Sequence, residues 1–350
     1  MGEPSLDWAI IGPGTIAAQF AADMARSGAG RIRAVVSRDE ARARAFAEVH
    51  CPSARSFSSP DAMIASGLAR AVYVATPHTA HRHAAEAAMA AGLSVLIEKP
   101  IAATLGDTDA IVAATSGGAI AREALWSLCL PATRSGFDAI RGGRIGALRS
   151  IRAELAFHRA YDPNHRLFDP AQGGGVLLDL GVYPLALAHA LAGPLQLDAA
   201  QCGHAANGVI DDVDMQLHGS SVKVHVGASF RRNGTNLFVA TGERGAIILA
   251  APFLKAQGFW IAGASAARLL EAPGAAGKVM RALTRRIPVP GFRWHDHRFD
   301  GGGLQFEIAD FSALVAGNDA ACRLPKLADS RAVMALMTEV ERRAQAASRT

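Results

Sequence analysis

The feature that most restricts the fold of this 350-residue chain is the alternation of short apolar runs with helix-type segments in its first hundred residues. Apolar or β-branched runs occur at 8–12, 31–38, 70–76 and 94–99, and segments of helix-forming residues lie between them at 15–27, 39–49 and 80–92. Strands joined by single helices through short connections predict a parallel sheet with helices on both faces. We therefore predict an α/β first domain that covers residues 1–122.

A glycine turn follows the first predicted strand. The segment GPGTIA, residues 12–17, matches the pattern G-x-G-x-x-G/A where the strand passes into a helix. The first glycine permits the tight turn, the second lets a pyrophosphate approach the backbone, and N–H groups at the helix start face the phosphates. A plain glycine turn is the alternative, but the position between strand and helix favours a dinucleotide-binding Rossmann domain. The predicted contacts are Gly12, Gly14, Thr15 and Ile16.

The end of the second predicted strand bears on the choice of dinucleotide. An NAD site usually has an acid there for the ribose hydroxyls, whereas this chain has Ser37 and Arg38, and its acid only at Asp39. A hydroxyl followed by a guanidinium suits a 2′-phosphate, because arginine pairs with phosphate oxygens in a planar, charge-assisted fork. If the strand ends one residue later, Asp39 reaches the ribose instead, and Arg38 could be a solvated loop residue. We predict NADP as the cofactor, with NAD as the alternative.

The segment SVLIEKPIAAT, residues 94–104, begins as a buried strand and then turns charged. Glu98 and Lys99 stand where the strand emerges, and Pro100 restricts the backbone of Lys99 and can form a cis bond with it. Ligands of open α/β sheets bind beyond the carboxyl ends of the strands. Lys99 is therefore predicted to face the nicotinamide end of a cofactor, and a lysine that merely ends a strand is the alternative.

Residues 123–350 show a different pattern and are predicted to form a substrate-binding and oligomerisation domain. Six apolar runs follow one another, at 147–157, 195–204, 210–217, 221–230, 235–241 and 245–250. Strands without intervening helices predict an α+β domain with a large, mainly antiparallel open sheet. Residues 272–278 are predicted to be a loop, and the C-terminal segment an amphipathic helix that could pack back on the first domain. Few helices remain to cover the sheet, so an apolar face predicts a homodimer or homotetramer.

Composition limits the class of protein. The chain is 50% hydrophobic and 19% charged, with a formal charge of +5 and no dense basic run, which argues against a nucleic-acid partner. Four scattered cysteines, and His295 and His297 without a third ligand, predict no metal site. The free thiols, an N-terminus without signal character and the lack of an apolar run long enough to cross a bilayer predict a cytoplasmic protein without a membrane partner.

Several segments together resemble the Gfo/Idh/MocA family of NAD(P)-dependent oxidoreductases. They are AIIGPGTIA (9–17), the run 72–102 that contains E-K-P, REALWSLCLPA (122–132), GGRIGALRSIRAEL (142–155), GGGVLLDLGVYPL (173–185) and GLQFEIADF (303–311). The E-K-P segment is specific, whereas the glycine motif is common. Within the family the chain is most similar to the branch of glucose–fructose oxidoreductase and the dimeric dihydrodiol dehydrogenases, which carry a similar E-A-x-W segment and a D-x-x-x-Y helix.

The resemblance implies an acid/base centre made of Lys99, Asp179 and Tyr183. Asp179 and Tyr183 are four residues apart amid apolar residues, hence on one face of a predicted helix. A lysine ammonium about 4 Å from a tyrosine, at an effective dielectric of about 20, favours the phenolate by roughly 4 kcal/mol before desolvation, which lowers the tyrosine pKa by up to about three units. Tyr183 would exchange the proton, and Asp179 would hold the substrate hydroxyl or orient Lys99. A buried acid with a structural hydrogen bond is the alternative for Asp179.

Other residues are assigned by position and resemblance. Trp126 is predicted to wall the substrate pocket, and an ordinary core aromatic is the alternative. Leu128 stands where dihydrodiol-type relatives usually have a basic residue, so their substrate is not carried over. Packing at a helix start is the alternative for His81. The predicted cofactor contacts at the strand ends are Thr76, Pro77, His78, His81, Glu98 and Lys99.

These observations predict an NADP-dependent enzyme that transfers a hydride between the nicotinamide and a secondary alcohol or carbonyl of a sugar or cyclic vicinal diol. Tyr183 acts as the acid/base with help from Lys99. One alternative is a dinucleotide-dependent glycoside hydrolase on the same fold, although its known branch carries Gly-Gly-His-Gly-Gly where this chain has Gly173–Gly175 and Val176. The other alternative is a non-catalytic NADP-binding sensor.

Overall fold

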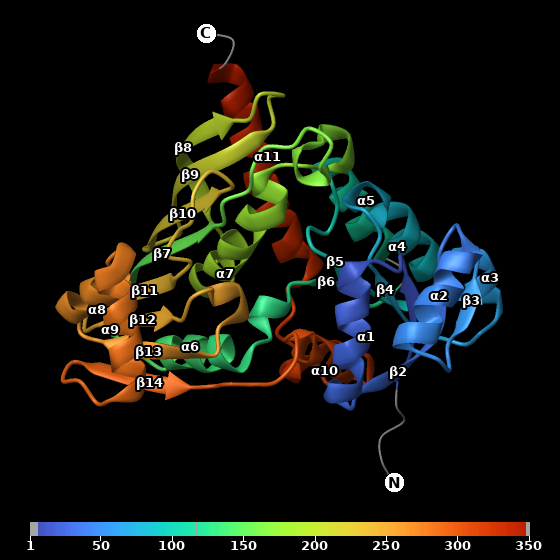
Figure 1. The fold of residues 1–350 in the computed structure, drawn as a ribbon, viewed down its shortest axis with the longest axis horizontal. Helices are drawn as coiled ribbons and strands as arrows, with labels where there is room; N and C mark the ends of the chain where they lie inside the picture. Colours follow the sequence, from blue (N-terminus) through green and yellow to red (C-terminus); the bar gives the residue numbers. More distant parts are fainter. Residues whose placement is uncertain (1–5, 116–117, 348–350) are drawn as a thin grey trace. The chain divides into compact units, whose positions relative to one another are not determined.

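The computed structural model describes residues 6–115 and 118–347, and the chain divides into two compact units. Unit 1 consists of Met1–Cys129 and Asp300–Met334, and unit 2 of Leu130–Phe299 and Ala335–Thr350 (Figure 1). The last helix, α11 (Leu327–Ala347), therefore contributes residues to both units. The division predicted at residue 122 stays a prediction about domains.

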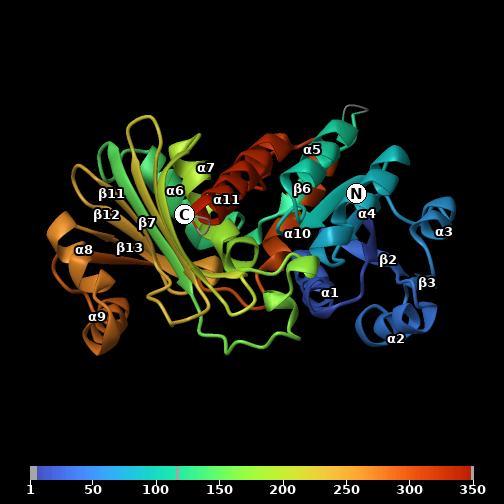
Figure 2. The same cartoon turned by 90° about the horizontal axis from the view of Figure 1, so that it is seen from above.

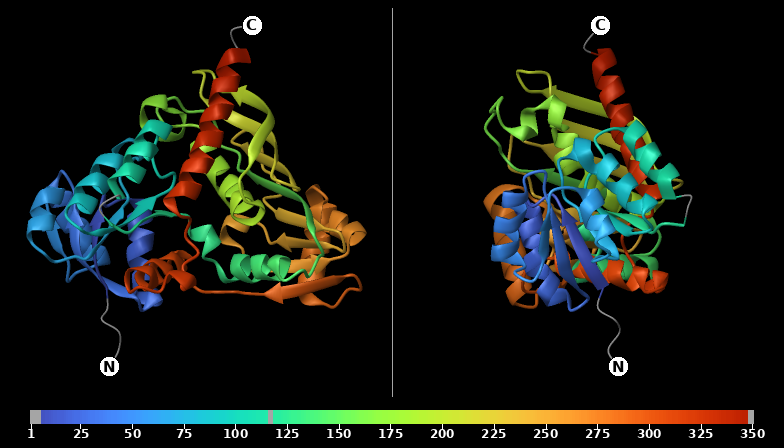
Figure 3. Two further views of the ribbon diagram at one scale, coloured as in Figure 1. Left: turned by 180° about the vertical axis from the view of Figure 1, so that it is seen from behind. Right: turned by 90° about the vertical axis from the view of Figure 1, so that its right-hand side faces the viewer.

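Unit 1 contains a six-stranded sheet in the order β3-β2-β1-β4-β5-β6, in which every neighbouring pair is parallel (Figure 3). Its strands are β1 (Leu6–Ile11), β2 (Gly30–Val36), β3 (Arg55–Phe57), β4 (Ala71–Val74), β5 (Ser94–Glu98) and β6 (Ala121–Ala124). Its helices are α1 (Thr15–Ser27), α2 (Glu40–His50), α3 (Pro60–Ala65), α4 (His81–Ala90), α5 (Leu105–Ala114) and α10 (Leu304–Val315), with short 3₁₀ turns η1 (His78–Ala80), η3 (Trp126–Leu128) and η8 (Asp319–Ala321). The predicted α/β architecture is confirmed, and the strand order reverses between β1 and β4, where such sheets bind ligands.

A late segment of the chain completes the core of unit 1. The fully buried Trp8 of β1 packs edge-on against Phe20 of α1, with ring centroids 5.4 Å apart, and against Phe311 of α10 at 5.3 Å. The buried carboxylate of Asp23 in α1 accepts hydrogen bonds from the backbone of Gly302 and Leu304, each 3.0 Å long. These contacts fix the start of α10 beside α1 (Figure 1).

Unit 2 contains an eight-stranded sheet in the order β14-β13-β12-β11-β7-β10-β9-β8. All neighbouring pairs are antiparallel except β7 and β10, so the predicted mainly antiparallel sheet is confirmed. The strands are β7 (Leu148–Ala156), β8 (Gln196–His204), β9 (Ile210–His218), β10 (Lys223–Ser229), β11 (Phe238–Gly242), β12 (Ala246–Leu249), β13 (Gly258–Ala262) and β14 (Phe292–Asp296). The helical segments are α6 (Pro131–Arg141), η4 (Arg166–Phe168), η5 (Pro170–Gln172), the π-helical η6 (Leu177–Gly181), α7 (Val182–Ala192), η7 (Phe253–Lys255), α8 (Ala264–Glu271) and α9 (Gly274–Arg286).

The two faces of this sheet are covered differently. Helices α6 and α7 lie on one face, while α8 and α9 lie on the other, against the strands β11 to β13 (Figure 2). On that second face Ala267 and Leu270 of α8 pack on Val239, Ile248 and Trp260. The prediction of a loop over residues 272–278 is wrong from Gly274 onward, because α9 begins there; only Ala272 and Pro273 form the connection between α8 and α9.

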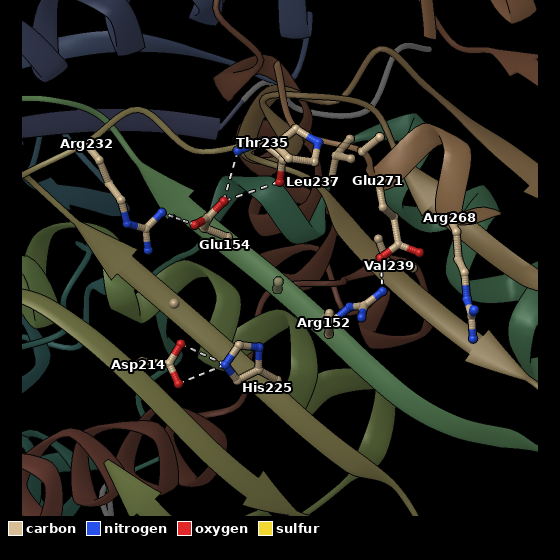
Figure 4. Close-up of a pocket in the computed structure, with 14 residues that line it drawn as sticks. Arg152, Glu154, Asp214, His225, Arg232, Thr235, Leu237, Val239, Arg268 and Glu271 are labelled. Carbon is tan, nitrogen blue, oxygen red and sulfur yellow. Dashed lines mark hydrogen bonds and ion pairs between the residues drawn. The ribbon is translucent and has the colours of Figure 1, made fainter. Parts of the chain in front are cut away.

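The outer face of β7, β10 and β9 carries charged side chains, in contrast to the apolar face predicted from the sequence. Residues alternate along these strands, so Ile151, Val224 and Met215 point into the core while their neighbours point outward. Among the outward-facing residues, Arg152 forms an ion pair with Glu271 of α8, and Glu154 forms one with Arg232 (Figure 4). His225 hydrogen-bonds to Asp214 on the neighbouring strand. These residues line a groove of about 570 Å³. The expectation of an exposed apolar face was wrong because the strand period puts every second residue, here mostly polar, on this side.

The run Pro170–Ala192 corrects a second expectation, that no segment is long and apolar enough to cross a bilayer. Its 23 residues include an 18-residue stretch with a mean hydropathy of 1.6, which satisfies that test by length and composition. In the structure 78% of its most apolar stretch is buried inside the protein. It forms η5, η6 and α7, and it serves as the central core helix of unit 2.

Candidate cofactor and catalytic site

The glycine turn between β1 and α1 has the geometry of a phosphate cradle. Gly12 has a φ of +96°, and a Cβ at this position would lie 2.7 Å from the carbonyl oxygen of Ala75. Only glycine fits there. At Gly14 a Cβ would meet nothing within 4 Å, so the space in front of the helix is open. No acidic residue stands in the first turn of α1, and its free N–H groups can bind an anion.

The turn after β2 places the predicted ribose contacts. β2 ends at Val36, and the Asp39 carboxylate accepts hydrogen bonds from the backbone of Ala41 at 3.0 Å and Arg42 at 3.4 Å. Asp39 is thus the N-cap of α2. Ser37 is half-buried and Arg38 is exposed. The strand ends two residues earlier than the predicted 31–38, and the contact of Ser37 and Arg38 with the ribose stays a prediction.

Arg42 is a residue of this region that the sequence did not single out. Its guanidinium donates a hydrogen bond of 3.3 Å to the carbonyl of Pro13, inside the glycine turn. A second arginine therefore lies between the start of α2 and the phosphate cradle. No residue pattern marks this role, because the contact with Pro13 joins positions 29 residues apart.

Glu98 and Lys99 end β5 next to the end of β4. The buried Glu98 carboxylate accepts a hydrogen bond from the Tyr73 hydroxyl and one of 3.0 Å from the Lys99 backbone N–H. Burial raises the pKa of Glu98, while the Tyr73 hydroxyl and the Lys99 ammonium act in the opposite direction. The Lys99–Pro100 bond is cis. The lysine is therefore carried by a turn whose backbone is held by a buried carboxylate.

His81 connects the ends of the two strands. Its fully buried ring lies between two carbonyl oxygens, with Nε2 2.9 Å from Thr76 and Nδ1 3.0 Å from Pro100. Burial lowers the pKa of this imidazole. The ring of His78, in η1, lies edge-on to it with centroids 5.7 Å apart. His81 thus holds the strand ends in place from within, which is the packing role left open by the sequence, and a direct cofactor contact by His81 stays a prediction.

Glu123 is a buried acid that was not among the site residues predicted from the sequence. It lies in β6, is only 2% exposed, and accepts a hydrogen bond of 2.9 Å from the backbone N–H of Ile101. Burial raises its pKa to about 7, with Glu98 acting in the same direction and Lys99 against it. The turn that carries Lys99 is therefore bounded by two buried carboxyl groups. The E-A-x-W segment contained the signal, since Glu123 is its first residue.

Trp126 follows β6 within η3 and is 9% exposed. Parallel strands end at the same edge of a sheet. One edge of the sheet in unit 1 therefore carries the residues that follow β4, β5 and β6, namely Thr76, Lys99 and Trp126. The predicted contacts at Gly12, Gly14, Thr15 and Ile16 follow β1 at that edge, beside β4.

The other two predicted catalytic residues lie in unit 2. Asp179 is half-buried in η6, whose hydrogen bonding is π-helical, and Tyr183 is in the first turn of α7 and 7% exposed. Short π-helical turns are rare and frequent at functional sites. The predicted helix therefore begins with a π-helical turn at Asp179. Asp179 and Tyr183 lie on the consecutive helical segments η6 and α7. The residues at 6–115 and 118–347 include no group of three or more His, Cys, Asp or Glu that could hold a metal ion, and His295 and His297 instead stack on Phe259.

Comparison with known proteins assigns the chain to a family. Residues 6–118 match the model described as "Oxidoreductase family, NAD-binding Rossmann fold", and residues 137–248 match the GFO/IDH/MocA C-terminal domain. The 1,5-anhydro-D-fructose reductase of Ensifer adhaerens is 33% identical over 67% of this chain and 71% of its own length. The trans-1,2-dihydrobenzene-1,2-diol dehydrogenase of Mus musculus is 36% identical over 51% of this chain and 54% of its own, so the chain spans about half the length of that relative.

A solved structure supports the fold along almost the whole chain. Levoglucosan dehydrogenase, in complex with NADH and levoglucosan, superposes with a TM-score of 0.79 over 97% of this chain and 96% of its own, at 20% identity. At that identity the likeness concerns the fold alone. The Rossmann match, the cradle at Gly12 and the 33% identity to the reductase lead to one conclusion: the chain belongs to the Gfo/Idh/MocA oxidoreductase family and carries its NAD(P)-binding domain.

Proposed function

We propose that this protein is an NADP-dependent oxidoreductase that transfers a hydride between the nicotinamide and a secondary alcohol or carbonyl of a sugar or cyclic vicinal diol. The observation that carries the proposal is the turn of Lys99, held by buried Glu98 and Glu123 at the same sheet edge as the open glycine turn. Relatives named as a dihydrodiol dehydrogenase and an anhydrofructose reductase support the substrate class.

The protein groups divide the chemistry as follows. The nicotinamide supplies or accepts the hydride when it is bound. The phenol of Tyr183 gives a proton to, or takes it from, the substrate oxygen, with assistance from Lys99. Asp179 binds the substrate hydroxyl or orients Lys99. The hydrogen bonds from Lys99 and Ile101 to the two buried carboxyls fix the backbone that aims the lysine.

The preference for NADP is proposed from the turn after β2. Asp39 is engaged as the cap of α2, while Ser37 and Arg38 follow β2 and Arg42 reaches the glycine turn at Pro13. Ser37, Arg38 and Arg42 are the residues proposed to contact a 2′-phosphate. Charge-assisted hydrogen bonds contribute about 1.5–3 kcal/mol each, so NADPH should bind roughly 10- to 100-fold more tightly than NADH. Fluorescence titration of both cofactors measures this ratio.

Replacing Ser37 with Asp and Arg38 with Ala should erase or reverse the cofactor ratio. Arg44→Ala serves as a matched control, because Arg44 is an exposed arginine of the adjacent helix α2 that ion-pairs with Glu40. Tighter binding of NADH by the unmodified protein would show that the ribose contacts are assigned wrongly.

The catalytic assignment is tested with a panel of sugars and cyclic diols, by following NADP(H) absorbance. Lys99→Met and Tyr183→Phe should each lower turnover by about 10²- to 10⁴-fold while cofactor binding is retained. Lys255→Met and Tyr161→Phe are matched controls, since they remove the same groups elsewhere in the chain. Near-normal turnover in both catalytic variants would refute the roles of Lys99 and Tyr183.

The same assay separates the two alternative functions. A glycoside hydrolase would release sugar from a glycoside without net change in NADP(H) absorbance. A sensor would bind NADP(H) and turn over no member of the panel. The joint presence of Lys99, Asp179 and Tyr183 favours the dehydrogenase or reductase.

Assembly and location are also proposals. We infer a homodimer or homotetramer, supported by the charged groove along β7, β10 and β9, whose ion pairs present both signs of charge to a partner (Figure 4). Light scattering at micromolar concentration measures the mass, and a monomer would contradict it. A cytoplasmic location is supported by Cys51, Cys129, Cys202 and Cys322, all free thiols.

A further inference from the structure

The helices α8 and α9 concentrate exposed apolar side chains on one part of unit 2. Six large apolar side chains are exposed among the described residues, and four of them are Leu269, Val279, Leu283 and Ile287. Val279, Leu283 and Ile287 follow one another at intervals of four, so they form a stripe along α9 and its C-terminal end. Val279 is 65% exposed and Leu283 42%.

The same segment holds most of the formal net charge of the protein. Residues 264–290 contain five basic residues (Arg268, Lys278, Arg281, Arg285 and Arg286) and one acidic residue, Glu271, a net charge of +4 against +5 for the whole chain. Around the axis of α9, at about 100° per residue, Arg286 lies about 20° from Val279, at the edge of the apolar stripe. Lys278 lies about 100° from Val279, on the polar side of the helix, and both basic residues are exposed. We call Leu269, Val279, Leu283, Ile287, Arg268, Lys278 and Arg286 the α8–α9 patch.

The remaining side of the helix pair is fixed to the sheet, so the patch is a defined surface. Arg281 donates to the carbonyl of Leu270, which belongs to α8. The guanidinium of Arg285 lies 4.9 Å from the ring centroids of both Trp260 and Trp294. Thr284 of α9 is also buried, and its hydroxyl donates within the helix to the carbonyl of Met280. Arg281 and Arg285 thus occupy the side of α9 that faces the sheet and α8, and the apolar stripe lies on the exposed side.

We propose that the α8–α9 patch docks the protein on an anionic lipid surface. A helix with an apolar stripe beside basic residues lies in the plane of a membrane interface, with the apolar side chains among the acyl chains and the cations at the headgroups. A second copy of the chain is disfavoured as the occupant, because the same basic patch on both partners would repel. This binding differs from the membrane span considered for Pro170–Ala192, which is buried in the core.

The test is sedimentation of the purified full chain with vesicles of phosphatidylcholine alone and of phosphatidylcholine mixed with phosphatidylglycerol. Binding to the mixed vesicles that weakens with added salt is expected, and little binding to the neutral vesicles. Each cation near an anionic surface adds about 1 kcal/mol, so Lys278→Gln with Arg286→Gln should weaken binding about 30-fold. Val279→Ser with Leu283→Ser should weaken it about 10-fold or more.

Matched controls remove the same groups outside the patch. Arg44→Gln with Arg70→Gln takes away two exposed arginines of unit 1, and Val49→Ser takes away an exposed apolar side chain of α2. Neither control should change vesicle binding. Absence of binding to the mixed vesicles, equal losses in patch and control variants, or binding to soluble polyglutamate in preference to vesicles would overturn the proposal, the last in favour of an acidic protein partner.

Discussion

The buried carboxyl of Glu123 gives the clearest quantitative prediction. Its side chain is 2% exposed, and burial raises its pKa to about 7 in the folded protein, against an ordinary value of 4.5. Between these two values the folded chain keeps a proton that the unfolded chain releases. Protonation therefore favours the folded state fully below pH 4.5, and this contribution is lost as the pH rises toward 7.

The size of the effect follows from the pKa difference. One unit corresponds to about 1.4 kcal/mol, so the free energy of unfolding of the normal protein should fall by about 3 kcal/mol over this interval because of Glu123 alone. In Glu123→Gln the amide keeps an acceptor for the Ile101 N–H and has no proton to release. The variant should therefore gain stability relative to the normal protein by about 3 kcal/mol from acidic to neutral pH.

Urea unfolding at a series of pH values, followed by tryptophan fluorescence, measures this difference. Trp8 and Trp126 both belong to unit 1, which contains Glu123, and they report its unfolding. Glu48→Gln removes an exposed carboxylate of α2 and serves as the control. Parallel curves of stability against pH for the normal protein and Glu123→Gln would refute the reasoning, since they would show the same protonation of Glu123 in both states.

Three further outcomes are expected. Gly12→Ala should lower NADPH affinity by about 100-fold or more in fluorescence titration, because its Cβ would lie 2.7 Å from the Ala75 carbonyl oxygen and φ is +96°. Gly67→Ala, also at positive φ but in open space, should leave the affinity unchanged. Glu307→Met should stabilise the protein by about 1–2 kcal/mol in thermal unfolding, because burial raises the pKa of Glu307 well above its ordinary value and neither carboxyl oxygen has a hydrogen-bond partner among the described residues; a lower melting temperature would contradict this. Asp39→Ala should cost about 1 kcal/mol through the lost cap of α2 yet leave the preference for NADPH in place, and a switch to NADH would disprove the assignment of Asp39 as a cap only.

Local pattern was enough to predict four of the six strands of unit 1, β1, β2, β4 and β5, and the turns that carry Gly12 and Lys99, whereas β3 and β6 were missed. Each of those strands is a short apolar run, and each turn is marked by glycine or by the charges of Glu98 and Lys99. The six strands predicted in the second half were also found. β13 and β14 were missed. β14 reads FRWHD, and its polar residues hide the strand pattern.

Other features depend on residues far apart in the sequence. The bond from Leu304 to Asp23 joins positions 281 residues apart, so nothing in either segment indicates that α10 belongs to unit 1. Arg42 and Glu123 acquire their roles from backbone groups of Pro13 and Ile101, which no residue pattern identifies. The sequence predicts which segments carry chemistry, and the structure adds the groups that hold those segments.

The late return of the chain to unit 1 has a consequence for how the protein is made. The ring of Trp8 packs against Phe311, which emerges from the ribosome only after all 170 residues of Leu130–Phe299. During synthesis the side of the first sheet that α10 later covers therefore stays exposed. Exposed apolar surfaces of this kind bind chaperones or aggregate. A fragment ending near residue 129 would keep that side uncovered permanently. Production of the cofactor-binding unit alone should therefore require a direct fusion of Asp300–Met334 to Cys129.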